Sequence, residues 1–133
     1  MLHSAVWESY EVAQKIMGDN WICFTKGVEN MQKVRKFSNC TILLSINDGT
    51  AEENIARLES IGGHCGISTV KYKLYTAEFC KALTDAGYEV QASIFPFEQE
   101  KLAIGNGITY LLTDRILPSR KWKKIKTRSV PTK

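Results

Sequence analysis

The chain has 133 residues, of which 44% are hydrophobic and 24% charged, and its formal net charge is +4. This length and composition are ordinary for one globular domain with a hydrophobic core. They argue against a membrane protein, since no apolar run approaches the roughly 18 residues that a span needs, and residues 1–10 lack the pattern of a secretion signal. We therefore expect a cytoplasmic protein with no transmembrane segment.

The first half of the chain predicts helices and strands in alternation. Apolar residues at helical spacing indicate a helix over residues 7–17, and a turn at 18–20 leads into a short apolar strand at 21–25. Apolar residues at every third position predict a second helix at 28–37. The most apolar segment, 40–46, predicts a strand that is covered on both faces.

The second half continues the alternation. Residues 47–50 predict a turn that caps a third helix, which runs to the Gly62-Gly63 pair. Residues 64–70 predict a weaker strand because Gly66 lowers its strand propensity. The remaining predicted elements are a helix at 76–85, a strand at 89–95, a short helix at 97–104 and a strand at 108–112.

The last segment, residues 118–133, is basic. Its seven lysines and arginines and its lack of acidic residues leave the rest of the chain slightly acidic. We expect an α/β domain at 1–117 followed by a flexible tail at 118–133. A basic tail with one Trp can contact nucleic acid or an anionic membrane surface, but a solubilising role is favoured, and nucleic acid is not the expected partner.

The spacing of about 20 to 25 residues between strands indicates parallel βα construction, with any active site at the C-terminal ends of the strands. Five parallel strands fit two architectures. One is a partial (β/α)8 barrel and the other is an open, doubly wound sheet resembling flavodoxin. Periodicity does not separate them.

Two segments near the C-terminal end resemble a known family. Residues 86–95, AGYEVQASIF, and residues 106–114, NGITYLLTD, resemble the seventh and eighth strands of glycerophosphodiester phosphodiesterases, which are (β/α)8 barrels. Gly107 and the Thr113-Asp114 pair match the family pattern, whereas Ser93 and Ile94 stand where the family has Trp and Thr. The resemblance implies a phosphodiester hydrolase of lipid metabolism, with only the C-terminal half of the barrel in this chain.

The same resemblance places the family's catalytic His residues and acidic metal ligands in the half that would precede Met1. No catalytic residue and no metal ligand therefore transfers to this sequence. A divalent metal, Mg or Ca, is expected only if a partner half completes the barrel. The resemblance thus implies a domain that is inactive alone.

Polar residues after the predicted strands are the candidate substrate-binding residues. Lys26, Lys71 and Arg115 follow three different strands and form a plausible cationic rim for the phosphate of a phosphodiester. Asp114 follows the last predicted strand, where it either binds a ligand or caps a helix. For Asp48, in the turn at 47–50, helix capping is favoured over ligand binding. His64 opens a strand, at the end opposite the expected site, and is expected to be structural.

Open strand edges and an uncovered inner face are liabilities in water, so we expect a homo-oligomer or a complementing half-barrel. The four cysteines show no CxxC spacing and are expected to be buried, reduced thiols. Two functions remain open. One is a phosphodiesterase part that needs completion, and the other is a noncatalytic binding or assembly module.

Overall fold

The computed structural model describes residues 2, 7–93 and 104–112. Nearly all of the helix predicted at 97–104, the end of the strand predicted at 89–95 and the predicted tail lie outside these ranges. In chain order the described elements are α1 (Glu8–Met17), β1 (Ile22–Lys26), α2 (Val28–Arg35), β2 (Thr41–Ser45), α3 (Ala51–Ile61), β3 (Cys65–Thr69), the 3-10 helix η1 (Tyr72–Leu74), α4 (Ala77–Asp85), β4 (Glu89–Ser93) and β5 (Tyr110–Leu112).

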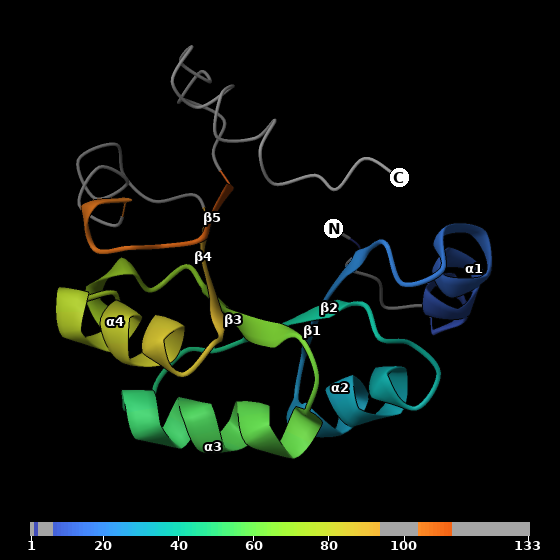
Figure 1. Ribbon diagram of the computed structural model, residues 1–133, viewed down its shortest axis with the longest axis horizontal. Coiled ribbons are helices and arrows are strands. Elements are labelled where there is room, and N and C mark those ends of the chain that lie inside the picture. The colour runs from blue at the N-terminus through green and yellow to red at the C-terminus, as the bar shows by residue number, and fades with distance from the viewer. Residues whose placement is uncertain (1, 3–6, 94–103, 113–133) are drawn as a thin grey trace, which may run out of the picture.

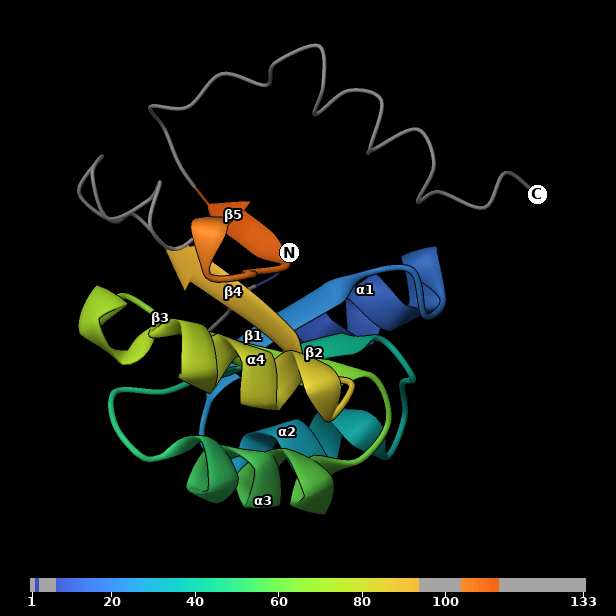
Figure 2. The ribbon, with the colours of Figure 1, turned by 60° about the vertical axis from the view of Figure 1, so that its left-hand side comes forward.

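The five strands form one sheet in the order β1-β2-β3-β4-β5, and every neighbouring pair is parallel. The predicted α/β domain of five parallel strands alternating with helices is confirmed. Figure 1 shows α2, α3 and α4 along one side of the sheet, and Figure 2 shows the same layering from a second direction. The strand order follows the chain without a reversal.

The hydrophobic core lies between the sheet and the helices. It combines apolar residues of the first four strands with apolar residues of the helices: Cys23, Ile42, Leu44, Cys65, Ile67, Val90 and Ala92 from the sheet, and Met31, Val34, Leu58, Ile61, Phe79, Cys80 and Leu83 from α2, α3 and α4. Burying one such large side chain contributes about 1.5–3 kcal/mol. This layer therefore supplies much of the drive to fold.

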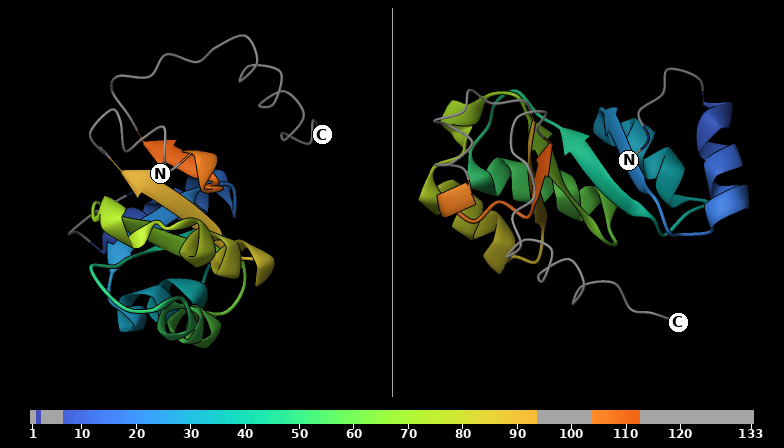
Figure 3. Two further views of the ribbon diagram at one scale, coloured as in Figure 1. Left: turned by 90° about the vertical axis from the view of Figure 1, so that its left-hand side faces the viewer. Right: turned by 90° about the horizontal axis from the view of Figure 1, so that it is seen from above.

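Helix α1 extends the helix layer at the β1 end of the sheet. Tyr10 and Ala13 of α1 belong to the same hydrophobic cluster as α2, and the ring of Trp7 meets Phe37 edge-on at 6.2 Å between centroids. Tyr10 also stacks on Trp21, with ring centroids 6.0 Å apart. Seen from above, α1 stands at one end of the molecule and α4 near the other (Figure 3).

Strand β2 forms where the sequence is most apolar, whereas strand β3 forms where the sequence has weak strand propensity. β2 contains Ile42, Leu43 and Leu44, which are all buried, as expected for a strand covered on both faces. β3 contains Gly66 and three polar or small residues, yet every position in it is buried. Its place between β2 and β4 overrides its weak propensity.

The helix ends follow the predicted capping chemistry. The hydroxyl oxygen of Thr76 accepts a hydrogen bond from the backbone N–H of Phe79 at 3.2 Å, at the start of α4. Gly87, with φ of 88°, lies just beyond α4 in the left-handed region that favours glycine. None of the helices in the described ranges is long and apolar enough to cross a membrane.

The free edge of β1 is partly paired. Leu2 makes a parallel bridge with Cys23, its N–H donates to the carbonyl oxygen of Ile22, and its carbonyl oxygen accepts from the N–H of Phe24. Leu2 thus occupies the next strand position of the sheet, with α1 as the connection to β1. The expectation that this edge is left open is wrong at these residues.

The face of the sheet opposite the helices is also less open than expected. Leu43, Ser68, Gln91 and Ser93 lie on this face of the middle strands and are each at most 8% exposed. Side chains of neighbouring strands contact one another there, as the hydroxyls of Ser68 and Ser93 do at 3.3 Å. The predicted uncovered inner face is therefore wrong for the centre of the sheet.

Candidate functional site

Alternation along each strand divides the sheet residues between two faces. Cys65 faces the helices, since its Sγ contacts the carbonyl oxygen of Leu58 in α3, so Gly66 and Ser68 of the same strand face the other way. Leu43, between the core residues Ile42 and Leu44, also faces away from the helices. Alternation from these residues identifies, for each strand, which side chains lie on the face opposite the helices.

A row of polar residues crosses this face, with one residue from each strand. The register pairs Lys26 with Ser45, Ser45 with Ser68, Ser68 with Gln91, and Gln91 with Tyr110. We call these five residues the polar row. The row lies toward the C-terminal ends of β1, β2 and β3, which is the end of a parallel sheet where ligands usually bind.

The polar row is buried in the middle and open at one end. Ser68 is 1% exposed and Gln91 4%, while Ser45 and Tyr110 are partly buried and Lys26 is exposed. The buried hydroxyl of Tyr75 donates a hydrogen bond to the backbone carbonyl oxygen of Gln91. This contact fixes the main chain of β4 beneath the row.

Two phenols near the row are held in the protonated form. Burial raises the pKa of Tyr75 above its ordinary value. Burial also raises the pKa of Tyr110, with a further contribution from the negative charge of Glu89. Both hydroxyls therefore remain hydrogen-bond donors across the physiological pH range.

The chemistry of the polar row suits an oxygen-rich ligand with one negative charge. It offers one ammonium group, two aliphatic hydroxyls, one carboxamide and one phenol, and no carboxylate that would repel an anion. Among the described residues, no group of three or more His, Cys, Asp or Glu side chains is arranged to hold a metal ion. Hydroxyl and phosphate oxygens are the ligand groups that side chains of these types can bind.

The predicted site residues are only partly brought together. Lys26 ends β1 and belongs to the polar row. Lys71 is exposed just beyond β3, where its N–H donates to the hydroxyl oxygen of Thr69 at 2.9 Å. Because β2 lies between β1 and β3, the strands that lead to these lysines are about 10 Å apart. Asp114 and Arg115 lie outside the described residues.

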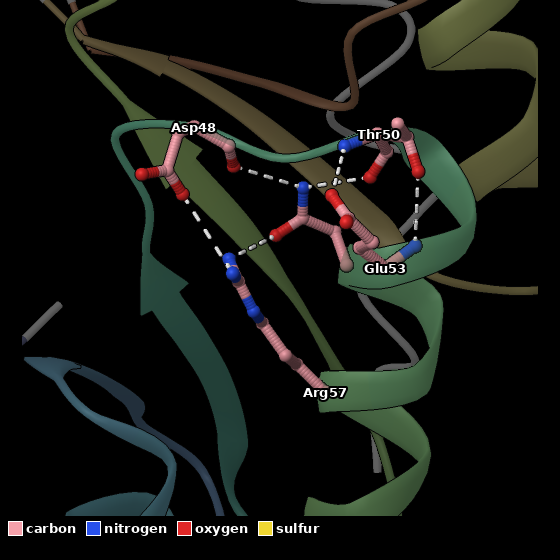
Figure 4. Close-up of polar contacts among 5 residues, drawn as sticks. Asp48, Thr50, Glu53 and Arg57 are labelled. Atoms are coloured by element: carbon pink, nitrogen blue, oxygen red, sulfur yellow. Dashed lines mark hydrogen bonds and ion pairs between the residues drawn. The ribbon is translucent and has the colours of Figure 1, made fainter.

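The loop after β2 binds its own helix (Figure 4). Thr50 and Glu53 form a capping box, in which each side chain accepts a hydrogen bond from the other residue's backbone N–H, at 3.2 and 2.8 Å. Asn54 donates to the carbonyl oxygens of Asp48 and Thr50, and Arg57 Nη2 lies 3.6 Å from Asp48 Oδ1. The cap is Thr50, while Asp48 pairs with Arg57.

Sequence reasoning missed four of the five residues in the polar row, because it considered residues beyond the strand ends rather than within the strands. A signal was present in Ser45, Ser68 and Gln91. Each is a polar residue inside a segment that was predicted to be a strand. Their mutual alignment depends on the strand register, which the sequence does not display.

No protein-family model matches this chain, and no curated protein and no solved structure is found to be similar to it.

Proposed function

We propose that this chain is the C-terminal part of a (β/α)8 barrel that binds a phosphodiester small molecule at the polar row and does not hydrolyse it alone. The observation that supports this best is the polar row itself, at the strand ends where barrels of this kind bind ligands. The resemblance of residues 86–95 and 106–114 to glycerophosphodiester phosphodiesterases names the ligand class.

The strand order supports a barrel rather than a flavodoxin-like sheet. A flavodoxin-like sheet has the order 2-1-3-4-5, with a switch point and helices on both faces. Here the order is sequential, and all four described α-helices contribute to one core on one face. Successive right-handed βα units in sequential order give this one-sided arrangement, and a (β/α)8 barrel is its closed form.

The proposed ligand matches the row in charge and size. A glycerophosphodiester has one negative charge on its phosphate and hydroxyl groups on its glycerol. Lys26 pairs with the phosphate, and the partly exposed Ser45 is the neighbouring hydroxyl in register with it. In this proposal the catalytic groups and the divalent metal come from a complementing segment, because the described part of the row contains no imidazole or carboxylate.

Amide chemical-shift mapping by NMR with glycerophosphocholine tests the proposal. We expect shifts centred on Lys26 and Ser45, and we expect Lys26→Ala to weaken binding about tenfold or more. Lys33→Ala on α2 is the matched control and leaves binding unchanged. Shifts confined to residues away from the row contradict the site, and hydrolysis by the chain alone with Mg²⁺ or Ca²⁺ contradicts the noncatalytic assignment.

A second candidate, an assembly module, is favoured by exposed apolar residues on α1. Val12, Ile16 and Met17 are 54%, 76% and 45% exposed. Val12 and Ile16 are one turn apart and, at 100° per residue, lie away from Trp7, which packs on Phe37 just beyond α2. Light scattering tests this candidate. It is supported if the chain associates and the double variant Val12→Ser, Ile16→Ser does not. A chain that stays monomeric at all concentrations opposes it.

A further inference from the structure

A hydrogen-bonded chain of three side chains lies at the N-terminal ends of the middle strands, and of the polar row only Tyr110 is affected by its charge. Thr41 Oγ1 is 3.0 Å from His64 Nδ1, and His64 Nε2 is 2.8 Å from Glu89 Oε1. The three residues stand at or just before the starts of β2, β3 and β4. Their side chains join three neighbouring strands on the face opposite the helices.

The close approach of β3 and β4 builds this chain. Register places Glu89 opposite Gly66, two residues beyond His64. A Cβ at Gly66 would lie 2.6 Å from the carbonyl carbon and from the Cβ of Glu89, so only glycine fits there. The missing side chain leaves space in which the Glu89 carboxylate reaches back across β3 to the imidazole.

The carboxylate fixes the tautomer of His64. An ionised carboxylate only accepts hydrogen bonds, so Nε2 carries the proton that it donates to Glu89. In the neutral ring Nδ1 is then an acceptor, and the hydroxyl of Thr41 donates to it. The order is therefore hydroxyl, imidazole base and orienting carboxylate.

We propose that Thr41 is a nucleophile activated by His64, with Glu89 as the positioning residue, and that it accepts acyl groups from activated carboxylic esters. A hydroxyl within hydrogen-bond reach of a base, which a third group orients, is the arrangement that activates weak nucleophiles in unrelated folds. Thr41 is partly exposed, and the side chains of His64 and Glu89 are 51% and 22% exposed. An ester can therefore approach from solvent.

The step balances in atoms and charge. Thr41 Oγ1 forms a bond to the acyl carbon while its proton passes to His64 Nδ1. The bond from the acyl carbon to the leaving oxygen breaks, and that oxygen departs with the electron pair and takes up the proton. Water then attacks the acyl-threonine with His64 again as the base, which releases the acid and restores the hydroxyl.

Incubation of the full chain with p-nitrophenyl acetate, followed by peptide mass spectrometry, tests the inference. We expect one acetyl group on the peptide that contains Thr41. Thr41→Val removes the adduct, and His64→Gln slows its formation by about 10²-fold, the lower range of general base catalysis. His3→Gln removes the other histidine of the sequence and leaves the rate unchanged.

The role of Glu89 is tested by replacing its carboxylate. Glu89→Gln keeps the size of the side chain but removes the charged acceptor that fixes the Nε2–H tautomer of His64. We expect acetylation of Thr41 to slow by about tenfold or more in Glu89→Gln and to be retained better in Glu89→Asp, with urea unfolding showing that both variants are folded. An equal rate in the parent protein and in Glu89→Gln would exclude a positioning role for Glu89.

Two results overturn the inference. One is acetylation spread over lysines with none on Thr41 in the parent protein, shown by urea unfolding to be folded. The other is a rate on Thr41 that His64→Gln leaves unchanged. Neither result bears on ligand binding at Lys26 and Ser45, which end β1 and β2 and are tested by a different ligand.

Discussion

Arg35 joins two loops that the sheet itself does not hold together. Its guanidinium donates four hydrogen bonds, all to backbone carbonyl oxygens: Ser38 and Cys40 in the loop before β2, and Gly62 and His64 in the loop before β3. Hydrogen bonds from charged donors are stronger than neutral ones. One side chain at the end of α2 thus fixes where two strands begin.

Replacing Arg35 tests this role. Arg35→Met keeps most of the aliphatic stem but removes all four donors, so we expect the free energy of unfolding to fall by about 2–4 kcal/mol. Urea unfolding measures the change. Lys33→Met removes an exposed charge from the same helix and is expected to change stability by less than about 0.5 kcal/mol. Equal effects of the two variants would show that the carbonyl contacts add nothing.

Asp19 gives the fold a defined dependence on pH. Its carboxylate accepts hydrogen bonds from the backbone N–H of Asn39 at 2.9 Å and from Gln14 at 3.0 Å. The Asn39 backbone contact is the main cause that lowers the pKa of Asp19 below its ordinary value. The ionised form is therefore favoured in the folded protein, and the group stabilises the fold when it is charged.

The sign of the effect follows from that lowered pKa. The contribution of the Asp19 carboxylate to the free energy of unfolding is complete above its unfolded-state pKa of about 4. It is lost as pH falls through the lower pKa of the folded state. We expect Asp19→Asn to be less stable than the parent at neutral pH, with the difference shrinking at acid pH. Urea unfolding at several pH values measures it. A difference that stays constant down to about pH 3 would exclude the carboxylate as its source.

Among the elements, the pairing of β3 with β4 depends on a single residue. The Cβ of an alanine at Gly66 would meet the backbone of Glu89 on the neighbouring strand, and a backbone in a sheet interior cannot move aside cheaply. Gly105 has open space around it and no positive φ. These two glycines are therefore a matched pair.

We expect Gly66→Ala to lower the free energy of unfolding by about 1–3 kcal/mol through overpacking. Gly105→Ala is expected to be neutral within about 0.5 kcal/mol. Thermal or urea unfolding of both variants makes the comparison. If Gly66→Ala proves as harmless as Gly105→Ala, the close contact between β3 and β4 is not a feature of the folded protein.

Elements were predicted well from the sequence where local chemistry decides them. The apolar run in β2 and the Thr76 cap of α4 each have a local cause, and each lies where the sequence placed it. The cap of α3 lies in the predicted turn at 47–50, but it is Thr50 and not Asp48, the residue for which capping was favoured. The 3-10 helix η1 was missed because no periodic pattern marks three residues. The polar row was missed because it is a property of five strands in register, which no single segment shows.

On the scale of the whole molecule, the described α/β layer has one continuous core from α1 to β4. The same cluster includes Tyr10 of α1, Cys23 of β1, Leu58 of α3 and Ala92 of β4. A domain whose elements share one core usually unfolds in one cooperative step. The four cysteines can show whether unfolding is cooperative, since they are distributed along that core.

All four thiols are buried and free. Burial raises the pKa of Cys23 to about 12 and that of Cys80 to about 11, and it also raises the pKa of Cys40 and Cys65. Because the thiolate is the reactive form, each thiol is protected both by inaccessibility and by its protonation. Reaction with a thiol reagent at about pH 8 therefore requires that the surrounding core open.

We expect pulsed labelling across a urea gradient, read by mass spectrometry of each cysteine peptide, to give one midpoint for all four thiols. The reason is that Cys23 at the β1 end and Cys80 in α4 belong to the same hydrophobic cluster, so neither becomes accessible without loss of the shared core. The unfolded chain, labelled at all four sites, sets the upper limit. Labelling of Cys80 at lower urea than Cys23 would instead divide the layer into units that open separately.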